Sequence, residues 1–528
     1  MIERIVVLAE SLTPIALIGP GGIGKTSVAL AILHHDRIKQ WFGNDRRFIR
    51  CDQFPPSHTH LLSRLSKVIG AGVENPEDLT PLRSFLSSTE MIIILDNAES
   101  IHDPHGANAL EIYAVVEELS QFDNICLCIT SRISTIPPDC ETLDVPTLPA
   151  EAARDAFYRI YKNDEQSDLV NGILEELDFH PLSITLLATV AHHNKWDVDR
   201  LAGEWNRRRI DVLHTQHNRS LAATIELSLA SPTFQELGPD ARGLLGVIAF
   251  FPQGVDEKSL EWVFPATSNR TKAFDNFCVL SLTYRSNGFV TMLAPLRDYL
   301  YPKDPKSSPL LCTTKECYFR RLSVRVNPNS PSFGEARWIM SEDVNVEHLV
   351  DVFTTIDANS SDVWSACGDF IVHLYWHKPR LVVLGPKIEG LPDDHLSKPE
   401  CLFRLSRLFG SVGNYVERRR LLVHALGLWR ERGNGFQVAQ TLRFLSNTNR
   451  MLELYKEGIK WAEEALEIYE QSNDVPGQAR CRQELALLLY DDKQLDAAEE
   501  AALRAIDLFS DEGDQFLVCE CYHILGNV

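Results

Sequence analysis

The chain has 528 residues, 44% of them apolar, and its 52 basic and 73 acidic residues give a formal net charge of −21. This length exceeds what one hydrophobic core supports, so we expect several domains. The acidic balance argues against a broad nucleic-acid-binding surface. The sequence contains no apolar run of about 18 residues that could span a membrane, and its 12 cysteines are scattered, several within apolar segments. We therefore expect a soluble, cytoplasmic protein with reduced thiols.

A short buried strand is predicted at 15–18, followed directly by a glycine-rich loop and a helix-forming stretch at 27–33. Glycines allow such a loop to curl so that its N–H groups point at phosphates, and the helix N-terminus adds partial positive charge. Lys25 would then reach the β- and γ-phosphates, and Thr26 would be a hydroxyl ligand of Mg²⁺. A purely structural turn is the alternative, which the flanking strand and helix disfavour. The residues expected to bind ATP or ADP here are Gly19, Pro20, Gly21, Gly22, Ile23, Gly24, Lys25, Thr26 and Ser27.

Two further buried strands are predicted at 91–96 and 125–129. The first ends in Asp96, which we predict to be the second Mg²⁺ ligand, because a P-loop site needs an acid from the end of another core strand. A carboxylate that forms a turn is the alternative for this residue. The second strand is followed by Arg132, a candidate catalytic sensor of the γ-phosphate at the carboxyl end of the sheet. A surface arginine is the alternative there.

In this order the motifs resemble those of the NB-ARC and NACHT-like STAND ATPases, which include plant and animal NLR receptors and many fungal NLR-like proteins. The glycine loop resembles their P-loop, residues 94–99 their Walker B motif and residues 130–132 their sensor motif. Further along, residues 148–152 are similar to the start of their small helical subdomain, and residues 179–182 to their GLPL motif. The resemblance implies that Pro181 packs near the adenine, and a proline that merely begins a helix is the alternative.

The Walker B segment departs from the family pattern. Many relatives carry two consecutive acids there, whereas this chain has Asn97 after Asp96, and an amide cannot usefully accept a proton. Glu99, two residues further on, is our candidate for orienting the attacking water, with a plain surface glutamate as the alternative. We expect the catalytic set of Lys25, Asp96, Glu99 and Arg132 to hydrolyse ATP slowly at most.

A later segment resembles the winged-helix subdomain of the same family, with an apolar helix at 244–251 and a strand at 289–292. In this family the subdomain is an internal switch element, and the acidic net charge agrees with that use. The last two positions of the MHD motif are Leu293 and Ala294 here, so the family's histidine contact with ADP is missing. Arg297, one helical turn further on, is a candidate replacement, and a solvent-facing arginine is the alternative.

The C-terminal end repeats with a period of 40 residues. Within each repeat an alanine and an aromatic residue stand four positions apart on one helix face, which allows close helix packing. This pattern resembles TPR repeats of the kind found in kinesin light chain, with HEAT-like repeats as the alternative. Because the sequence ends at the first helix of another pair, we expect the array to continue or to fray. The aligned residues are Ala425, Ala465 and Ala505 with Trp429, Tyr469 and Phe509, and the expected breaks lie at Gly433, Gly477 and Gly513.

These observations predict a multidomain α/β plus α protein. It would combine a P-loop NTPase parallel sheet, a helical subdomain, a winged-helix subdomain and a C-terminal TPR-like α-solenoid. The family's motif that precedes the segment at 2–6 is absent, so we expect the first domain to be incomplete at its N-terminal edge. The predicted boundaries are 1–145 for the P-loop domain, 146–212 for the helical subdomain, 213–302 for the winged-helix-like subdomain, 303–400 for a helical linker and 401–528 for the repeats.

The resemblance implies a signalling ATPase that switches between a closed ADP state and an open ATP state that oligomerises. Its cofactors would be ATP or ADP with Mg²⁺, its repeats would bind a protein or peptide in their groove, and its role would lie in signal transduction and innate immunity. Nucleic acid is not an expected partner. One alternative is a TPR scaffold whose nucleotide is only structural. The other is a STAND-type transcriptional regulator, which the lack of a convincing basic helix disfavours.

Overall fold

The structure is a computed structural model, and it divides the chain into two compact units. The first contains Met1–Tyr318 with Glu342–Leu349, and the second contains Phe319–Ser341 with Val350–Val528. No helix in the described ranges is both long and apolar enough to cross a bilayer. The described residues are 1–53, 58–70, 80–101, 109–132, 140–162, 167–212, 219–264, 270–324, 338–380, 382–512 and 515–527.

The first unit begins with a parallel sheet in the strand order β2-β3-β4-β1-β5. The strands are β1 (Ile15–Ile18), β2 (Arg46–Arg50), β3 (Met91–Asp96), β4 (Ile125–Ser131) and β5 (Glu141–Asp144). Every residue of β1, β3 and β4 is buried, because helices cover both faces of the sheet. The continuous apolar runs of the sequence are therefore the central strands, as predicted.

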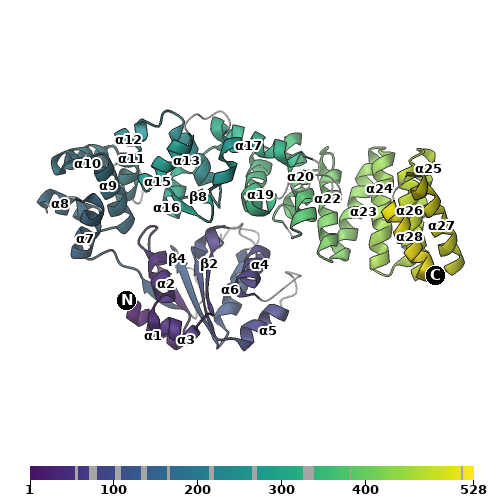
Figure 1. The fold of residues 1–528 in the computed structure, drawn as a ribbon, viewed down its shortest axis with the longest axis horizontal. Coiled ribbons are helices and arrows are strands. Elements are labelled where there is room, and N and C mark those ends of the chain that lie inside the picture. The colour runs from purple at the N-terminus through teal and green to yellow at the C-terminus, as the bar shows by residue number, and fades with distance from the viewer. Residues whose placement is uncertain are drawn as a thin grey trace. The chain divides into compact units, whose positions relative to one another are not determined.

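Alternate residues of each central strand belong to two separate cores. Ile92 and Ile94 pack on one face of β3, while Ile93 and Leu95 pack on the other. Figure 1 shows α1, α2 and α3 on one side of this sheet and α4, α5 and α6 on the other. These helices are α1 (Ile2–Glu10), α2 (Lys25–Leu33), α3 (Asp36–Phe42), α4 (His58–Ile69), α5 (Thr80–Ser88) and α6 (Ala109–Ser120).

Four helices follow the sheet, within the segment expected to form a helical subdomain. They are α7 (Ala150–Tyr161), α8 (Asp168–Glu176), α9 (Pro181–His193) and α10 (Val198–Val212). Pro181 occupies the first turn of α9, where its missing N–H costs nothing, and the His180 side chain caps the helix by accepting from the Ser183 N–H.

The next segment combines helices with an antiparallel sheet of order β6-β8-β7. This combination agrees with the winged-helix prediction, whose expected first residues, 213–218, lie outside the described residues. The helices are α11 (Arg219–Leu229), α12 (Pro232–Gln235), α13 (Ala241–Phe250), α14 (Leu260–Val263), α15 (Arg270–Val279) and α16 (Ala294–Leu300), and the strands are β6 (Val255–Asp256), β7 (Tyr284–Ser286) and β8 (Phe289–Thr291).

The segment expected to be one linker, 303–400, is divided between the two units. Helix α19 contributes Glu342–Leu349 to the first unit, and both of its ends belong to the second. The expected boundary at residue 400 falls within the first turn of α22. The helices of this segment are α17 (Pro309–Leu322), α19 (Ile339–Ile356), α20 (Ser361–His377) and α21 (Gly385–Glu389).

The second unit ends in a series of antiparallel helix pairs. Helices α23, α25 and α27 begin at Tyr415, Tyr455 and Leu495, so the sequence period of 40 residues is the period of the helices. Ala425, Ala465 and Ala505 are fully buried, as close helix packing requires. The helices are α22 (Lys398–Ser411), α23 (Tyr415–Glu431), α24 (Gly435–Met451), α25 (Tyr455–Gln471), α26 (Val475–Asp491), α27 (Leu495–Glu512) and α28 (Gln515–Asn527).

The turns between α22 and α27 follow a shorter period of 20 residues: each of these turns contains one residue with positive φ, 20 positions after the last. The prediction that Gly477 marks a break is wrong: it lies in the first turn of α26, where a Cβ would come within 2.4 Å of the Tyr469 ring. Glycine is required there by close packing and not by a turn. Gly513 lies outside the described residues. The positive-φ residues are Gly413, Gly433, Glu453, Asn473 and Lys493.

Replacing Gly433 by alanine should destabilise this part of the array by about 1 kcal/mol, because Gly433 has φ 66° and an L side chain is strained there. Gly427 is the matched control, since it lies within α23 and, like Gly433, has open space where a Cβ would be added. Gly427→Ala should instead stabilise the helix by about 1 kcal/mol. Hydrogen exchange of the α23 and α24 amides measures both changes, and equal effects would contradict the conformational explanation.

Candidate functional site

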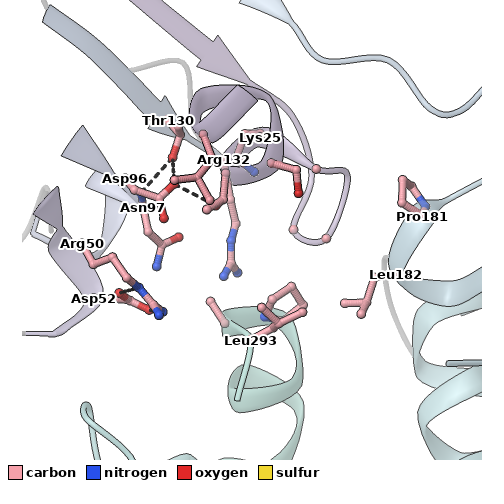
Figure 2. A pocket seen from close by; sticks show the side chains of 18 of the residues that line it. Lys25, Arg50, Asp52, Asp96, Asn97, Thr130, Arg132, Pro181, Leu182 and Leu293 are labelled. Carbon is pink, nitrogen blue, oxygen red and sulfur yellow. Dashed lines mark hydrogen bonds and ion pairs between the residues drawn. The ribbon is translucent and has the colours of Figure 1, made fainter. Parts of the chain in front are cut away.

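A cavity of about 480 Å³ opens on the glycine loop between β1 and α2. Figure 2 shows side chains from the strand ends, from the start of α9 and from the start of α16 facing this space. Three segments that are distant in sequence therefore share one site within the first unit. The lining residues are Gly21, Gly22, Gly24, Lys25, Thr26, Ser27, Leu30, Phe48, Arg50, Asp52, Asp96, Asn97, Thr130, Arg132, Pro181, Leu182, Thr185, Tyr284, Leu293, Ala294 and Pro295.

The glycine loop needs its glycines for two different reasons. Gly22 and Gly24 have φ of 82° and 107°, conformations that L side chains rarely adopt. Gly21 and Gly22 also lie against neighbouring segments: a Cβ on Gly22 would come within 2.8 Å of Leu182, and one on Gly21 within 2.8 Å of Pro295. The loop is therefore both curled and closely covered by residues from α9 and α16.

Lys25 is the first residue of α2 and only 8% exposed. Its Nζ donates hydrogen bonds to the carbonyl oxygens of Gly19 at 2.7 Å and Pro20 at 3.0 Å. Burial lowers the pKa of Lys25, Glu99 opposes that change, and Arg132 adds to it. The ammonium group thus has neutral acceptors in the loop, and an anionic ligand would bind it more strongly.

Asp96 lies at the end of β3 and is 3% exposed. Its Oδ1 accepts hydrogen bonds from the hydroxyls of Thr26 at 2.8 Å and Thr130 at 2.7 Å. Burial raises the pKa of Asp96, and the two hydroxyl hydrogen bonds oppose this shift. The predicted Mg²⁺ ligands Thr26 and Asp96 are therefore adjacent, and the Asn97 N–H fixes the arrangement by donating to the Thr130 oxygen at 2.8 Å.

Arg132 follows β4 and bridges two carboxylates. Its Nε lies 2.9 Å from Oε1 of Glu99, and its Nη1 donates to Asp298 on α16. Burial raises the pKa of Glu99, and its interactions with Arg132 and Lys25 oppose this shift. Arg132 lines the cavity, whereas Glu99 is not among the lining residues. The structure thus pairs two of the four candidate catalytic residues with each other, and Arg132 is the one that lines the cavity.

Sequence reasoning missed a buried network that also faces the cavity. Arg50, at the end of β2, donates to both carboxylate oxygens of Asp52 at 3.1 and 2.8 Å and to the Tyr284 hydroxyl at 2.7 Å. Arg297 on α16 lies 3.5 Å from Asp52 and donates to the Pro252 carbonyl at 3.1 Å. Arg50 and Asp52 follow a parallel strand, as Asp96 and Arg132 do, but β2 lacks the unbroken apolar run that would have marked it as a strand in the sequence.

The alternative of a solvent-facing arginine is wrong for Arg297. Its side chain is 13% exposed, so it is not a solvent-facing arginine, and it does not line the cavity. Burial lowers its pKa, and the Asp52 carboxylate opposes that change. Burial also acts to lower the pKa of Arg50, but Asp52 outweighs it and the net shift is upward. The shared carboxylate connects the end of β2 to α16.

Pro181 lines the cavity at the start of α9, beside Leu182. The preceding residue, His180, was also missed: its Nε2–H donates to the Gly21 carbonyl at 2.9 Å. Burial lowers the pKa of His180, which favours the neutral ring. Leu293 is 41% exposed and lies at the N-terminus of α16, where the family histidine would stand.

These residues fit a nucleoside phosphate with Mg²⁺. The loop has the positive-φ glycines that allow N–H groups to converge, the Lys25 ammonium donates to neutral loop carbonyls, and the Thr26 hydroxyl lies beside a buried carboxylate. Across the described ranges, no group of three or more His, Cys, Asp or Glu side chains could hold a metal ion. Phosphate and water oxygens would complete the coordination of Mg²⁺, as this ion prefers.

Comparison with known proteins identifies one part of the chain. The tetratricopeptide repeat family model matches residues 437–511, and no curated protein gives a match. Similar solved structures include a signal transduction ATPase with numerous domains (STAND) that has a tetratricopeptide repeat sensor, from Pyrococcus horikoshii, at 12% identity and TM-score 0.42, over 98% of this chain and 84% of that one. A Walker-type ATPase of Pyrococcus abyssi is similar at 12% identity and TM-score 0.31, over 57% of this chain and 93% of that one. Within residues 437–511 this match supports tetratricopeptide repeats over the HEAT alternative.

Proposed function

We propose that this chain is a STAND-type signalling ATPase whose state is set by the nucleotide bound at the glycine loop. The observation that supports this proposal is the composition of the cavity wall. Residues from the P-loop sheet, from α9 and from α16 line one space, so a ligand there contacts all three segments at once. A ligand that fits one arrangement of these segments better than another shifts the equilibrium between them.

Arg132 is the residue whose contacts would differ between the ADP-bound and the ATP-bound chain. In the present arrangement its guanidinium pairs with Asp298 and so adds an exposed contact between α16 and the end of β4. With ADP bound this pair can persist. A terminal phosphate in the cavity would compete with Asp298 for the same guanidinium, because phosphate oxygens are strong acceptors for arginine. ATP would thereby favour release of α16, and in our proposal the released state oligomerises.

The remaining residues have roles that their contacts suggest. Lys25 would exchange its two carbonyl acceptors for phosphate oxygens, and Thr26 with Asp96 would hold Mg²⁺, which neutralises phosphate charge. Asn97 cannot act as a base, and Glu99 is paired with Arg132. We therefore propose slow hydrolysis of ATP to ADP, which suits a switch that marks a state. The resemblance to NLR-like proteins is our reason for proposing an immune signalling role.

The proposal is tested by identifying the nucleotide that the purified chain retains. We expect about one ADP per chain after denaturation and chromatography, because a site covered by α9 and α16 should release its ligand slowly. Adding ATP with Mg²⁺ should increase hydrogen exchange in α16, whereas ADP should not. A chain without nucleotide that also shows no exchange difference would contradict the switch and favour the scaffold alternative.

A further inference from the structure

The second unit contains three arginines around one aromatic ring. The guanidinium carbons of Arg407 on α22, Arg418 on α23 and Arg443 on α24 lie 5.7, 5.6 and 4.8 Å from the ring centroid of Phe444. These distances are within cation–π range. Three helices thus bring three positive charges to one point, where like charges repel each other.

Two further aromatic rings extend this group. Arg407 also lies 4.4 Å from the ring of Tyr375 and 6.0 Å from that of Trp376, both near the end of α20. Trp376 is 37% exposed, and Arg407, Arg443 and Phe444 are half-buried. Solvent therefore reaches part of the group. We call these residues the arginine–aromatic cluster, and they are Tyr375, Trp376, Arg407, Arg418, Arg443 and Phe444.

The charges of this cluster have no carboxylate partner among the described residues. Within that part of the chain none of its three arginines lies in an ion pair. Burial raises the pKa of the Tyr469 phenol, and the positive charge of Arg443 opposes that shift. The lack of ion pairs in the described ranges is unusual for the array, in which the other arginines of α22 to α27 commonly pair with an acid. Those in ion pairs are Arg404, Arg419, Arg420, Arg430, Arg450, Arg482 and Arg504.

Burial makes the missing partners costly. Arg418 is only 9% exposed, and Nε of both Arg407 and Arg418 is buried without a hydrogen-bond partner in the described ranges. Burial lowers the pKa of Arg418, and Arg407 adds to this shift while Glu484 opposes it. The Glu484 carboxylate is itself bound by the Asn447 amide at 3.2 Å. An external anion would supply the charge and the acceptors that the cluster lacks.

We propose that the arginine–aromatic cluster is a binding site for an acidic peptide segment of a partner protein. Peptide carboxylates would accept from Arg407 and Arg418, and an aromatic or aliphatic peptide side chain would pack on Phe444 and Trp376. This proposal names the class of ligand that the repeats of the proposed switch would bind. In assigning the cluster to a signalling partner, it rests on the proposed function. The contacts themselves lie within the second unit and require no nucleotide.

An acidic peptide fits better than a nucleic acid. The net charge of −21 repels a long polyanion, and α25 presents Glu457, Glu463 and Glu467 as exposed carboxylates within the same array. A peptide can place one or two carboxylates at the cluster and continue with neutral residues. A phosphate backbone would extend its charge onto the acidic helices.

The test measures binding of labelled probes to the full chain by fluorescence anisotropy. The probes are a decapeptide that alternates glutamate and tyrosine, its counterpart with lysine in place of glutamate, and a thymidine decanucleotide. We expect the acidic peptide alone to bind, with an affinity that falls as salt rises. In the Arg407→Gln/Arg418→Gln double variant its affinity should fall roughly tenfold or more, because two charge-assisted contacts are lost.

The matched control is the Arg430→Gln/Arg504→Gln variant, which removes the same charge from exposed ion pairs and should bind like the unmodified chain. If the first double variant unfolds, as judged by hydrogen exchange of α22 to α24, Arg407→Gln alone replaces it, since Arg407 is half-buried. Failure of the acidic peptide to bind, equal loss in the control, or preference for the oligonucleotide would each overturn the proposal. Retained ADP in the same samples reports on the nucleotide switch separately, so that one proposal can fail without the other.

Discussion

Replacing Lys25 by alanine is expected to lower the affinity of the chain for ADP or ATP by about two orders of magnitude. The side chain is 8% exposed, and its ammonium group donates to two loop carbonyls. Phosphate oxygens would therefore be its first charged acceptors in the loop. Losing such a contact in a buried site costs about 3 kcal/mol, which corresponds to roughly a hundredfold change in affinity. Isothermal titration with a nucleotide-free preparation measures it.

Lys39→Ala is the control for this change. Lys39 belongs to α3 of the same domain and forms an exposed pair with Asp36 at 3.2 Å, so its loss removes equal charge away from the cavity. Its nucleotide affinity should remain within a factor of two of the unmodified chain. Lys25→Ala removes a buried cation, whose burial costs free energy, so the variant should still fold. Unchanged affinity in Lys25→Ala would show that the glycine loop is not the nucleotide site.

The sequence predicted those parts of the site that local patterns encode. The glycine loop combines an apolar strand, positive-φ glycines and a helix, all within residues 15–33, and each part has a residue signature. Asp96 and Arg132 follow β3 and β4, whose unbroken apolar runs mark them as central strands. In both cases the information lies within a few residues of the functional group.

The residues that cover the cavity could not be placed in this way. Asp52 and Arg297 are 245 positions apart in sequence and share no local pattern. The strand that presents Arg50 and Asp52 contains three arginines and pairs on one side only, with β3, so it lacks the apolar run of a central strand. The family histidine is replaced by Leu293, and the ionic contacts that α16 makes with the sheet domain are formed instead by Arg297 and Asp298.

The repeats show a different limit to what can be predicted from the sequence. The period of 40 residues was readable because buried alanine and aromatic positions tolerate few substitutes. The period of 20 residues was not, because the positive-φ position of each turn is glycine only at Gly413 and Gly433, and the later turns use Glu453, Asn473 and Lys493. Tertiary packing of the helices holds Glu453 and Lys493 in a conformation that their local preference opposes, whereas asparagine adopts it more readily.

Replacing Asp52 by alanine is expected to destabilise the first unit by about 3 kcal/mol or more. Asp52 is the common carboxylate for Arg50 and Arg297, and its side chain is 3% exposed. Removing it leaves two guanidinium groups in a buried site without an anion, which is the costly way to break a buried ion pair. Thermal unfolding should report the loss, and hydrogen exchange should locate it in β7 and α16.

Two comparison variants separate this buried network from the exposed pair beside it. Asp298→Ala removes a carboxylate that is 57% exposed, so its effect on the free energy of unfolding should stay below about 1 kcal/mol. Arg297→Met removes one of the two cations but leaves Asp52 bound to Arg50 by two hydrogen bonds, so it should cost less than Asp52→Ala. If Asp298→Ala proves as harmful as Asp52→Ala, the exposed pair and not the buried carboxylate holds α16 against the sheet. The proposed competition between Asp298 and a terminal phosphate for Arg132 requires that Asp298→Ala cost less stability than Asp52→Ala. A switch needs the Arg132–Asp298 contact to be weak enough to exchange and the Asp52 network to be strong enough to keep α16 and the sheet in register.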